Sequence, residues 1–303
     1  MTVMKKILVT GSNGFIGQEL VNQILLRQDM NPIALSRGDN RIQHEKEFIY
    51  QSADVCDEEA LKSVIEEYKP DTVIHTVALA NVDQCEADPA ECNRINVTPV
   101  QHLTRMAERF GFHLIYLSTD FIFDGLNGPY KEEDEARPLN HYGASKYEAE
   151  RIIQQSNSLW SIVRTILVYG APRDRNRSNF VLWVKKSLEN KQEIQVVTDH
   201  FRMPTLVDDL AEACLTIAAK RVTGIYHISS EELFSVYEIA QEVADFWNLD
   251  KSLLRPAKST ELASKVERPS YTGFNIDKAK EDLAFSTSSL KEGLEKIDHA
   301  FFC

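Results

Sequence analysis

The stretch Lys6-Ile7-Leu8-Val9-Thr10-Gly11-Ser12-Asn13-Gly14-Phe15-Ile16-Gly17 joins a short apolar run to glycines spaced Gly-x-x-Gly-x-x-Gly. An amphipathic pattern typical of a helix follows it, with apolar residues at Leu20, Val21, Ile24 and Leu25. Small residues in such a turn let the backbone approach a pyrophosphate, whose charge is stabilised by the unpaired amides and the positive dipole end of the helix. We therefore expect a dinucleotide site here rather than a plain strand-to-helix connection.

The residues that this loop contributes to cofactor binding share one turn and the start of one helix. They are expected to be Gly11, Asn13, Gly14, Phe15, Ile16 and Gly17.

Short β-branched runs alternate with longer helical patterns through the first half of the chain. Because these runs are apolar throughout, they suit a parallel sheet that helices cover on both faces, which is a doubly wound α/β fold. The predicted strands are residues 6–10, 32–36, 47–51, 72–77, 114–118 and 161–165.

The pattern loosens after Gly170, where a second lobe is expected to begin. We predict a dinucleotide-binding domain at residues 1–170, to which residues 205–230 return. Residues 171–204 and 231–303 are expected to form a smaller, mostly helical lobe that binds the substrate.

The end of the second predicted strand bears on the choice of nicotinamide cofactor. An acidic residue there accepts hydrogen bonds from a ribose 2'-hydroxyl, whereas arginine pairs with a 2'-phosphate. This chain has Ser36 and Arg37, which favours NADP(H), although Asp39 nearby leaves NAD(H) open. The alternative interpretation of Arg37 is an exposed polar loop.

Tyr142 and Lys146 are spaced i,i+4, so both side chains project from one face of a predicted helix. A nearby ammonium group stabilises a phenolate, and we expect Lys146 to lower the pKa of Tyr142 toward neutrality. Thr119 ends a central strand and is expected to donate a hydrogen bond to the developing alkoxide. A Tyr-x-x-x-Lys pair alone is common on helix surfaces, so it is informative only with the glycine loop before it.

Taken together, these motifs resemble the extended short-chain dehydrogenase/reductase family, and within it the dTDP-4-dehydrorhamnose reductases. The matching segments cover about the first 210 residues. They are residues 118–125, 138–146, Val82-Asp83-x-Cys85-Glu86, Ile95-Asn96-Val97, Arg164-Thr165, Tyr169-Gly170, Pro204-Thr205 and Asp209-Leu210-Ala211.

The resemblance implies that a keto group on a nucleotide-linked deoxysugar is reduced by NADPH or NADH, with Thr119, Tyr142 and Lys146 as catalytic residues. It also implies a cofactor role for Lys146 at the nicotinamide ribose. Further residues are assigned to the cofactor cleft, namely Asp54, Val55, Thr76, Val77 and Ala78, although the family usually has Asn-Ala-Ala where this chain has residues 76–78.

Four residues are candidates for the substrate side of the cleft: Asp120, Asn179, Arg202 and Arg268. Arginine suits a diphosphate because its planar fork matches phosphate oxygens. The alternative for Arg202 is a surface ion pair, and for Asp120 a cap on a backbone turn.

Two other functions remain open. Epimerases of nucleotide sugars share the fold, but they favour an acidic residue where this chain has Ser36 and Arg37. A non-catalytic regulatory subunit is the second alternative, because a subunit of methionine adenosyltransferase resembles the same reductases. Intact Thr119, Tyr142 and Lys146 favour an enzyme.

Composition bears on the partners of the protein and on its cellular compartment. A formal net charge of -12 disfavours nucleic acid as a partner. The five cysteines are spread along the chain without a Cys-x-x-Cys pair, which favours a reducing cytoplasm over a disulfide framework or a metal site. No apolar run is long enough for a membrane span, and the family resemblance implies a homodimer.

Overall fold

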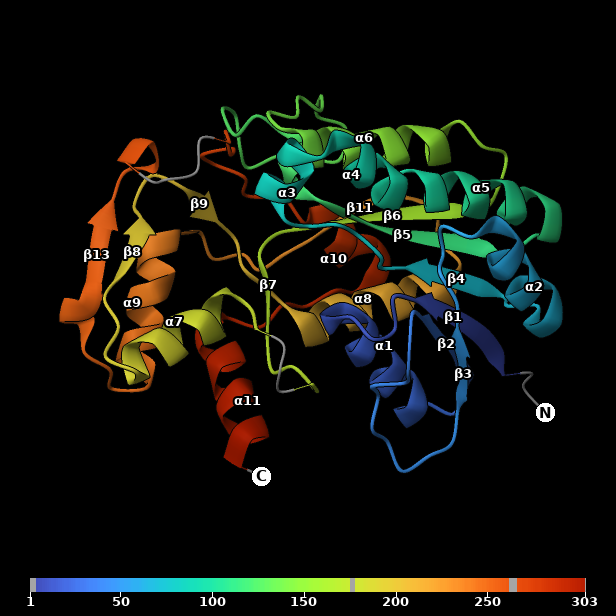
Figure 1. Ribbon diagram of the computed structural model, residues 1–303, viewed down its shortest axis with the longest axis horizontal. Coiled ribbons are helices and arrows are strands. Elements are labelled where there is room, and N and C mark those ends of the chain that lie inside the picture. Colours follow the sequence, from blue (N-terminus) through green and yellow to red (C-terminus); the bar gives the residue numbers. More distant parts are fainter. Residues whose placement is uncertain (1–3, 175–177, 262–265, 303) are drawn as a thin grey trace.

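Seven parallel strands form the central sheet of the computed structural model, which describes residues 4–174, 178–261 and 266–302. Every neighbouring pair of these strands is parallel, which confirms the predicted doubly wound α/β class. From one edge to the other (Figure 1) they are β3 (Ile49–Ser52), β2 (Met30–Ser36), β1 (Lys5–Thr10), β4 (Thr72–His75), β5 (His113–Thr119), β6 (Trp160–Thr165) and β11 (Gly224–Ile228).

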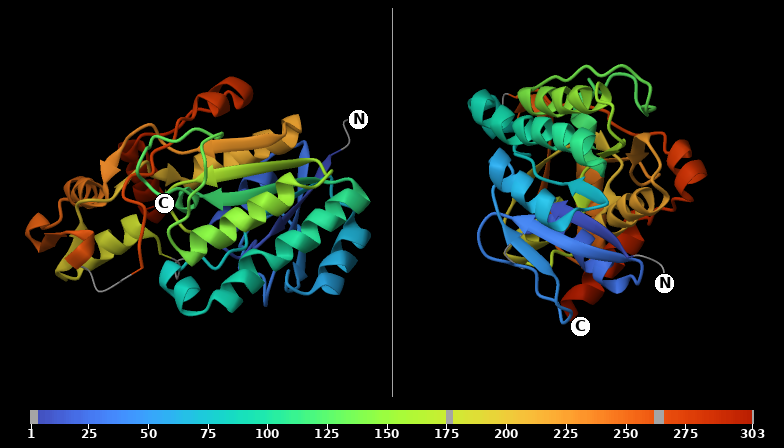
Figure 2. Two further views of the ribbon diagram at one scale, coloured as in Figure 1. Left: turned by 90° about the horizontal axis from the view of Figure 1, so that it is seen from above. Right: turned by 90° about the vertical axis from the view of Figure 1, so that its right-hand side faces the viewer.

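Helices cover both faces of the sheet (Figures 1 and 2), so each face has its own apolar core. On one face lie α1 (Phe15–Leu26) and α8 (Val207–Lys220), which contact each other. On the other face lie α2 (Glu58–Tyr68), α5 (Thr98–Phe110) and α6 (His141–Gln154). Strands buried from both sides explain why the sequence runs are apolar throughout.

Strand order reverses between β1 and β4, because the chain builds outward from β1 through β2 and β3 and then returns to the other side of β1. In open α/β sheets, ligands bind outside the carboxyl ends of the strands at such a reversal. The loops after β1, β4 and β5 therefore form the place to look for a site.

A second group of elements has an apolar core of its own and lies to the left in Figure 1. Apolar side chains from three helices and two strands meet there, together with Tyr169 and Leu206. The elements are α7 (Phe180–Glu189), β8 (Ile194–Val197), α9 (Val236–Phe246), β13 (Leu254–Ala257) and α11 (Leu290–Phe302).

The C-terminal part of the chain differs from the prediction in two respects. β13 pairs in parallel with β8, in a part of the chain for which a mostly helical structure and no particular strand was predicted. The helix α10 (Asp277–Leu283) packs on α8 and β11, and its Ala279 and Leu283 belong to a core of the central sheet rather than to the second group of elements. Within the residues that the structure describes, no helix is long and apolar enough to cross a membrane.

Candidate functional site

The glycine loop forms a tight connection between β1 and α1. Gly11 has a φ of +77°, in the left-handed region that favours glycine. A Cβ atom on Gly17 would lie 2.2 Å from the Gly11 carbonyl oxygen, so the first turn of α1 packs directly on the loop. Gly14 is the N-cap residue of α1, and no side chain caps the amides of its first turn. These amides are the groups that bind an anion in a dinucleotide fold.

Asn13 holds the loop that follows β2. Its Nδ2 atom donates to the Asp39 carbonyl oxygen at 2.9 Å and to the Tyr50 hydroxyl at 3.0 Å, and its Oδ1 atom accepts from the Arg41 amide at 3.0 Å. Asn13 therefore fixes the conformation of the loop after β2. We expect the residues at this end of β2 to distinguish NADP(H) from NAD(H).

A pocket of about 190 Å³ lies beyond this loop, at the ends of β1, β2 and β4. Arg37 and Asp54 meet across it at 3.8 Å, and the Arg37 side chain is 71% exposed, so its guanidinium group is accessible. Cys56 and Arg94 also line this pocket. They were not predicted from the sequence, because neither residue lies in a motif typical of cofactor binding. The predicted residues that line it are Gly11, Asn13, Gly14, Ser36, Arg37, Asp54, Val55, Thr76, Val77 and Ala78.

A larger cavity of about 1490 Å³ adjoins this pocket, and Thr76 and Ala78 line both. The two spaces therefore adjoin at Thr76 and Ala78, one beside the glycine loop and the other at the carboxyl end of β5. The predicted residues that line the larger cavity are Ile16, Thr76, Ala78, Thr119, Asp120, Tyr142, Lys146, Arg202 and Arg268. Phe15 and Gly17 belong to the first turn of α1 and do not line either space.

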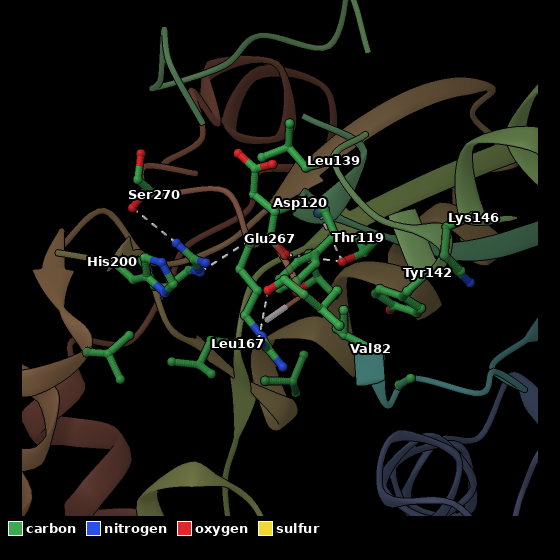
Figure 3. Close-up of a pocket in the computed structure, with 18 of the residues that line it drawn as sticks. Val82, Thr119, Asp120, Leu139, Tyr142, Lys146, Leu167, His200, Glu267 and Ser270 are labelled. Carbon is green, nitrogen blue, oxygen red and sulfur yellow. Dashed lines mark hydrogen bonds and ion pairs between the residues drawn. The ribbon is translucent and has the colours of Figure 1, made fainter. Parts of the chain in front are cut away.

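Thr119, Tyr142 and Lys146 lie together along one wall of the cavity (Figure 3). Thr119 is the last residue of β5, and the other two lie one turn apart on α6. Asn140 caps α6 by accepting a hydrogen bond from the Gly143 amide at 2.9 Å. A Cβ on Gly143 would lie 2.1 Å from the Phe121 carbonyl oxygen, so α6 packs directly on the loop after β5.

Lys146 is buried and its ammonium group has two partners. The Nζ atom donates to the Leu117 carbonyl oxygen at 2.6 Å and lies 4.1 Å from the centre of the Tyr116 ring. Burial lowers the pKa of Lys146 to about 7, and the Glu150 carboxylate opposes this shift.

The pKa of Tyr142 differs from the expectation. Burial raises it above its ordinary value, and the side-chain hydrogen bond with Thr119 opposes the rise. Desolvation of the phenol is the largest cause, and it outweighs the attraction that the i,i+4 spacing of Tyr142 and Lys146 suggested. The protonated phenol is therefore favoured near neutral pH, which suits a proton donor.

The helices α3 (Val82–Ala87) and α4 (Pro89–Asn96) support α6 from behind. Asn96 donates from Nδ2 to the Ser145 hydroxyl at 2.9 Å, and Ser145 donates to the Tyr142 carbonyl oxygen at 2.7 Å. The thiols of Cys85 and Cys92 lie 2.7 Å apart in the same contact. The polar network fixes the first turn of α6.

Arg202 is buried instead of lying on the surface or reaching freely into the cavity. It forms an ion pair with Asp120 at 3.6 Å. Its Nη2 atom donates to the Pro269 carbonyl oxygen at 2.7 Å, and its Nη1 atom donates to those of Phe201 and Ser270 at 2.8 and 3.3 Å. These partners occupy most of its donors, and Arg202 also lines the cavity.

The remaining two candidates on the substrate side differ from each other. Arg268 lines the cavity, and its Nη2 atom donates to Asp83 at 2.7 Å. Asn179 instead caps α7, accepting from the Leu182 amide and donating to the Gly170 carbonyl oxygen at 2.8 Å. Sequence analysis missed His200, which lies on the opposite wall (Figure 3) two residues before Arg202.

Comparison with known proteins gives one family for almost the whole chain. The family model described as the RmlD substrate binding domain matches residues 4–301. The chain is 32% identical to the spore coat polysaccharide biosynthesis protein SpsK of Bacillus subtilis (strain 168), over 89% of this chain and 88% of that protein. It is also 32% identical to the methionine adenosyltransferase 2 subunit beta of Xenopus laevis, over 83% of this chain and 75% of that one.

Solved structures agree with this result. The crystal structure of dTDP-4-dehydrorhamnose reductase from Bacillus anthracis str. Ames, in complex with NADP, superposes with a TM-score of 0.86. The two chains are 26% identical, and the match covers 98% of this chain and 100% of that one.

Proposed function

The chain belongs to the RmlD substrate binding domain family, and on that premise we propose that it is an NAD(P)H-dependent reductase of a keto group on a nucleotide-linked deoxysugar. The observation that carries the proposal is that the pocket beside the glycine loop adjoins the cavity lined by Thr119, Tyr142 and Lys146. The likeness to dTDP-4-dehydrorhamnose reductase supports the substrate class.

The residues present fit a nicotinamide dinucleotide. The close contact of Gly17 with Gly11 leaves no room for a side chain where a pyrophosphate would approach the backbone. Residues after β2 and β3 would hold the adenosine, and Lys146 would hold the nicotinamide ribose. When bound, the reduced cofactor supplies a hydride for the carbonyl carbon.

Proton transfer is the task of this chain's own residues. The protonated Tyr142 donates its Oη proton to the carbonyl oxygen as negative charge develops there. Lys146 lies one turn further along α6, and its positive charge stabilises the phenolate that remains. Thr119 lines the same cavity and lowers the pKa of the phenol against the effect of burial, which favours the phenolate that forms.

We propose NADPH as the preferred cofactor, because the accessible guanidinium of Arg37 lies where a 2'-phosphate would bind. The nearby Asp54 competes for the same guanidinium, so NADH remains a usable second cofactor. The complex of the reductase from Bacillus anthracis with NADP supports this order.

The proposal also assigns cofactor binding and substrate binding to different parts of the chain. Residues 1–170 and 205–230 bind the cofactor, and residues 171–204 together with most of 231–303 bind the sugar nucleotide. We further propose a homodimer in a reducing cytoplasm, on the family resemblance and the free thiols. Light scattering at working concentration tests the dimer, and a monomer mass would contradict it.

Oxidation of NADPH in the presence of dTDP-4-dehydrorhamnose is the direct test of the activity. The wild-type protein should consume NADPH, and Tyr142→Phe should lower kcat by about 100-fold or more while the Kd for NADPH stays within about twofold. A wild-type protein that binds NADPH but turns over no nucleotide-linked keto sugar would contradict the proposal.

The same variant separates an enzyme from a non-catalytic subunit, the alternative that the similarity to methionine adenosyltransferase 2 subunit beta favours. A non-catalytic subunit should retain its full effect on a partner enzyme when Tyr142 becomes Phe, because the phenol proton has no role there.

A further inference from the structure

Residues 266–274 form part of the wall of the larger cavity, and they lie outside every helix and strand that the structure describes. Without a backbone ladder of its own, this segment depends on hydrogen bonds from other parts of the chain. The residues of the segment that line the cavity are Val266, Glu267, Arg268 and Ser270. Arg268 is the only basic residue of the segment, so the way in which its backbone is held decides where this wall presents a positive charge.

The carbonyl groups on either side of Arg268 each accept a hydrogen bond from a buried side chain. Nδ2 of Asn140 donates to the Glu267 carbonyl oxygen at 2.9 Å, and Nη2 of Arg202 donates to that of Pro269 at 2.7 Å. Asn140 is 6% exposed and Arg202 is 5% exposed, so water does not readily replace either bond. The backbone of Arg268 is therefore fixed on both sides, by residues that lie far from it in the sequence.

The Asn140 side chain also begins the helix that carries Tyr142. Its Oδ1 atom accepts a hydrogen bond from the Gly143 amide at 2.9 Å, while its Nδ2 atom holds Glu267. Aspartate and serine cap helices about as well as asparagine, but aspartate has no donor and the hydroxyl of serine lies nearer to its own backbone. Asn140 therefore joins the start of α6 to the backbone beside Arg268, which a cap alone does not require.

Arg268 carries a charge that suits the phosphates of the proposed substrate. It lines the same cavity as Tyr142, and its Nη2 atom donates to Asp83 on α3 at 2.7 Å, so an acidic oxygen already binds this guanidinium group. Phosphate oxygens match the planar fork of a guanidinium group in the same way. A backbone that is fixed before binding loses less conformational entropy when a ligand binds.

We propose that Asn140 is a positioning residue for substrate binding: by holding the Glu267 carbonyl oxygen, it fixes Arg268 in the cavity for the phosphates of a nucleotide-linked sugar. The two hydrogen bonds of Asn140 then have different effects. The bond to Gly143 supports the helix that carries Tyr142, and the bond to Glu267 supports the affinity for the substrate. This inference rests on the proposed function for its kinetic readout.

Asn140→Asp and Asn140→Ser each keep a side chain that caps a helix but remove the donor to Glu267. Both should raise the Kd for dTDP and the KM for the keto-sugar nucleotide about tenfold, through the loss of one buried hydrogen bond. The kcat should stay within about threefold of wild type, and the Kd for NADPH within about twofold, because the cap of α6 remains. A weaker affinity in the aspartate variant alone would come from its added charge and would overturn the proposal.

A double-mutant cycle tests whether Asn140 acts through Arg268. Arg268→Met should weaken dTDP binding by at least about tenfold, because it removes the charge and keeps a long side chain. In the Arg268→Met background, Asn140→Ser should weaken dTDP binding by less than about twofold, as measured by calorimetry. An equal loss from Asn140→Ser in both backgrounds would show that Asn140 does not act through Arg268.

Hydrogen exchange of the protein without nucleotide measures the effect of Asn140 on the wall directly. The backbone amides of residues 266–274 should exchange about tenfold faster in both Asn140 variants than in wild type. Asn81→Asp is the control and should leave this exchange unchanged, because Asn81 caps α3 from an exposed position by accepting from the Gln84 amide at 2.9 Å. Unchanged exchange in both Asn140 variants would overturn the proposal.

The failure of this proposal and the failure of the proposed function give different results. A wild type that binds dTDP but reduces no nucleotide-linked keto sugar would contradict the proposed function and leave the role of Asn140 in place. A wild type that reduces the keto sugar, with Asn140 variants that bind dTDP as tightly as it does, would overturn the role of Asn140 and leave the function in place.

Discussion

The ammonium group of Lys146 lies 4.1 Å from the centre of the Tyr116 ring and donates a hydrogen bond of 2.6 Å to the Leu117 carbonyl oxygen. The aromatic face and the carbonyl dipole both stabilise a positive charge that burial otherwise disfavours. These two contacts do not fully offset the cost of burying the charge, because the pKa of Lys146 remains at about 7. The candidate site therefore contains a cation that gains or loses its proton near neutral pH.

This balance predicts a pH dependence of stability in the protein without added nucleotide. The folded pKa of about 7 is below the ordinary value of 10.5, so between these values the unfolded chain binds a proton that the folded chain does not. The contribution of Lys146 to stability must then rise with pH across this window.

Lys146→Met removes the titration and nearly preserves the volume of the side chain. By urea denaturation, the variant should be more stable than wild type by a few kcal/mol near pH 7, and the difference should shrink toward pH 10. Lys186→Met, at an exposed lysine of α7, is the control and should show no such trend. A difference that does not change with pH would argue against a buried, titrating Lys146.

The contact of Gly17 with Gly11 predicts the effect of one added methyl group. Gly17→Ala would place a Cβ 2.2 Å from the Gly11 carbonyl oxygen, so α1 must move away from the loop. We expect a loss of about 1–3 kcal/mol of stability and of most NADPH binding, measured by fluorescence. Gly111→Ala is the control: Gly111 is the C-cap residue of α5, where a φ of +77° strains an alanine but open space surrounds the Cβ, and NADPH binding should be retained. Equal binding by both variants would contradict a close-packed loop.

Features that depend on neighbouring residues could be predicted from the sequence. The glycine loop and the Tyr142/Lys146 pair each lie within one turn or one helix, so their spacing determines their geometry. The apolar strands likewise indicated a sheet that is buried on both faces. β13 was missed because Pro256 lies within it, and proline argues against a strand except at an edge.

Features that depend on distant segments could not be predicted. Arg202 was a good candidate for a phosphate ligand until the fold brought Asp120 and three carbonyl groups to it. Asn179 is the N-cap residue of α7, a local role that its place directly before the helix could have indicated and that was passed over for a place in the cleft. The pKa of Tyr142 depends on how deeply the ring is buried, and spacing on a helix does not report burial.

Arg37 gives a prediction for cofactor choice. Its side chain is 71% exposed and the Asp54 carboxylate lies 3.8 Å from its guanidinium group, so Arg37 is accessible for a charge-assisted hydrogen bond to a 2'-phosphate. Arg37→Ala should weaken NADPH binding about tenfold and change NADH binding less than about twofold, as measured by calorimetry. The exposed Arg41, which does not line the pocket, provides the matched alanine variant. If both cofactors lose affinity equally, Arg37 does not recognise the phosphate.

Behind the site, Glu150 and Arg164 form an ion pair that solvent does not reach. Their side chains are 0% and 3% exposed, and Arg164 donates to both carboxylate oxygens, with its shortest contact at 2.7 Å. Arg164 also meets Nε2 of His227 at 3.2 Å, so the pair connects α6, β6 and β11. Removing one partner leaves the other charge buried without compensation.

Glu150→Gln should therefore destabilise the protein by about 3–5 kcal/mol, seen as a lower midpoint in urea denaturation. Glu148→Gln provides the comparison on the same helix, because Glu148 pairs with Arg151 at 3.1 Å with both side chains about half exposed. That variant should lose less than about 1 kcal/mol. Similar small losses in both variants would show that the buried pair contributes no more than a surface one, and that α6 owes its position to apolar packing instead.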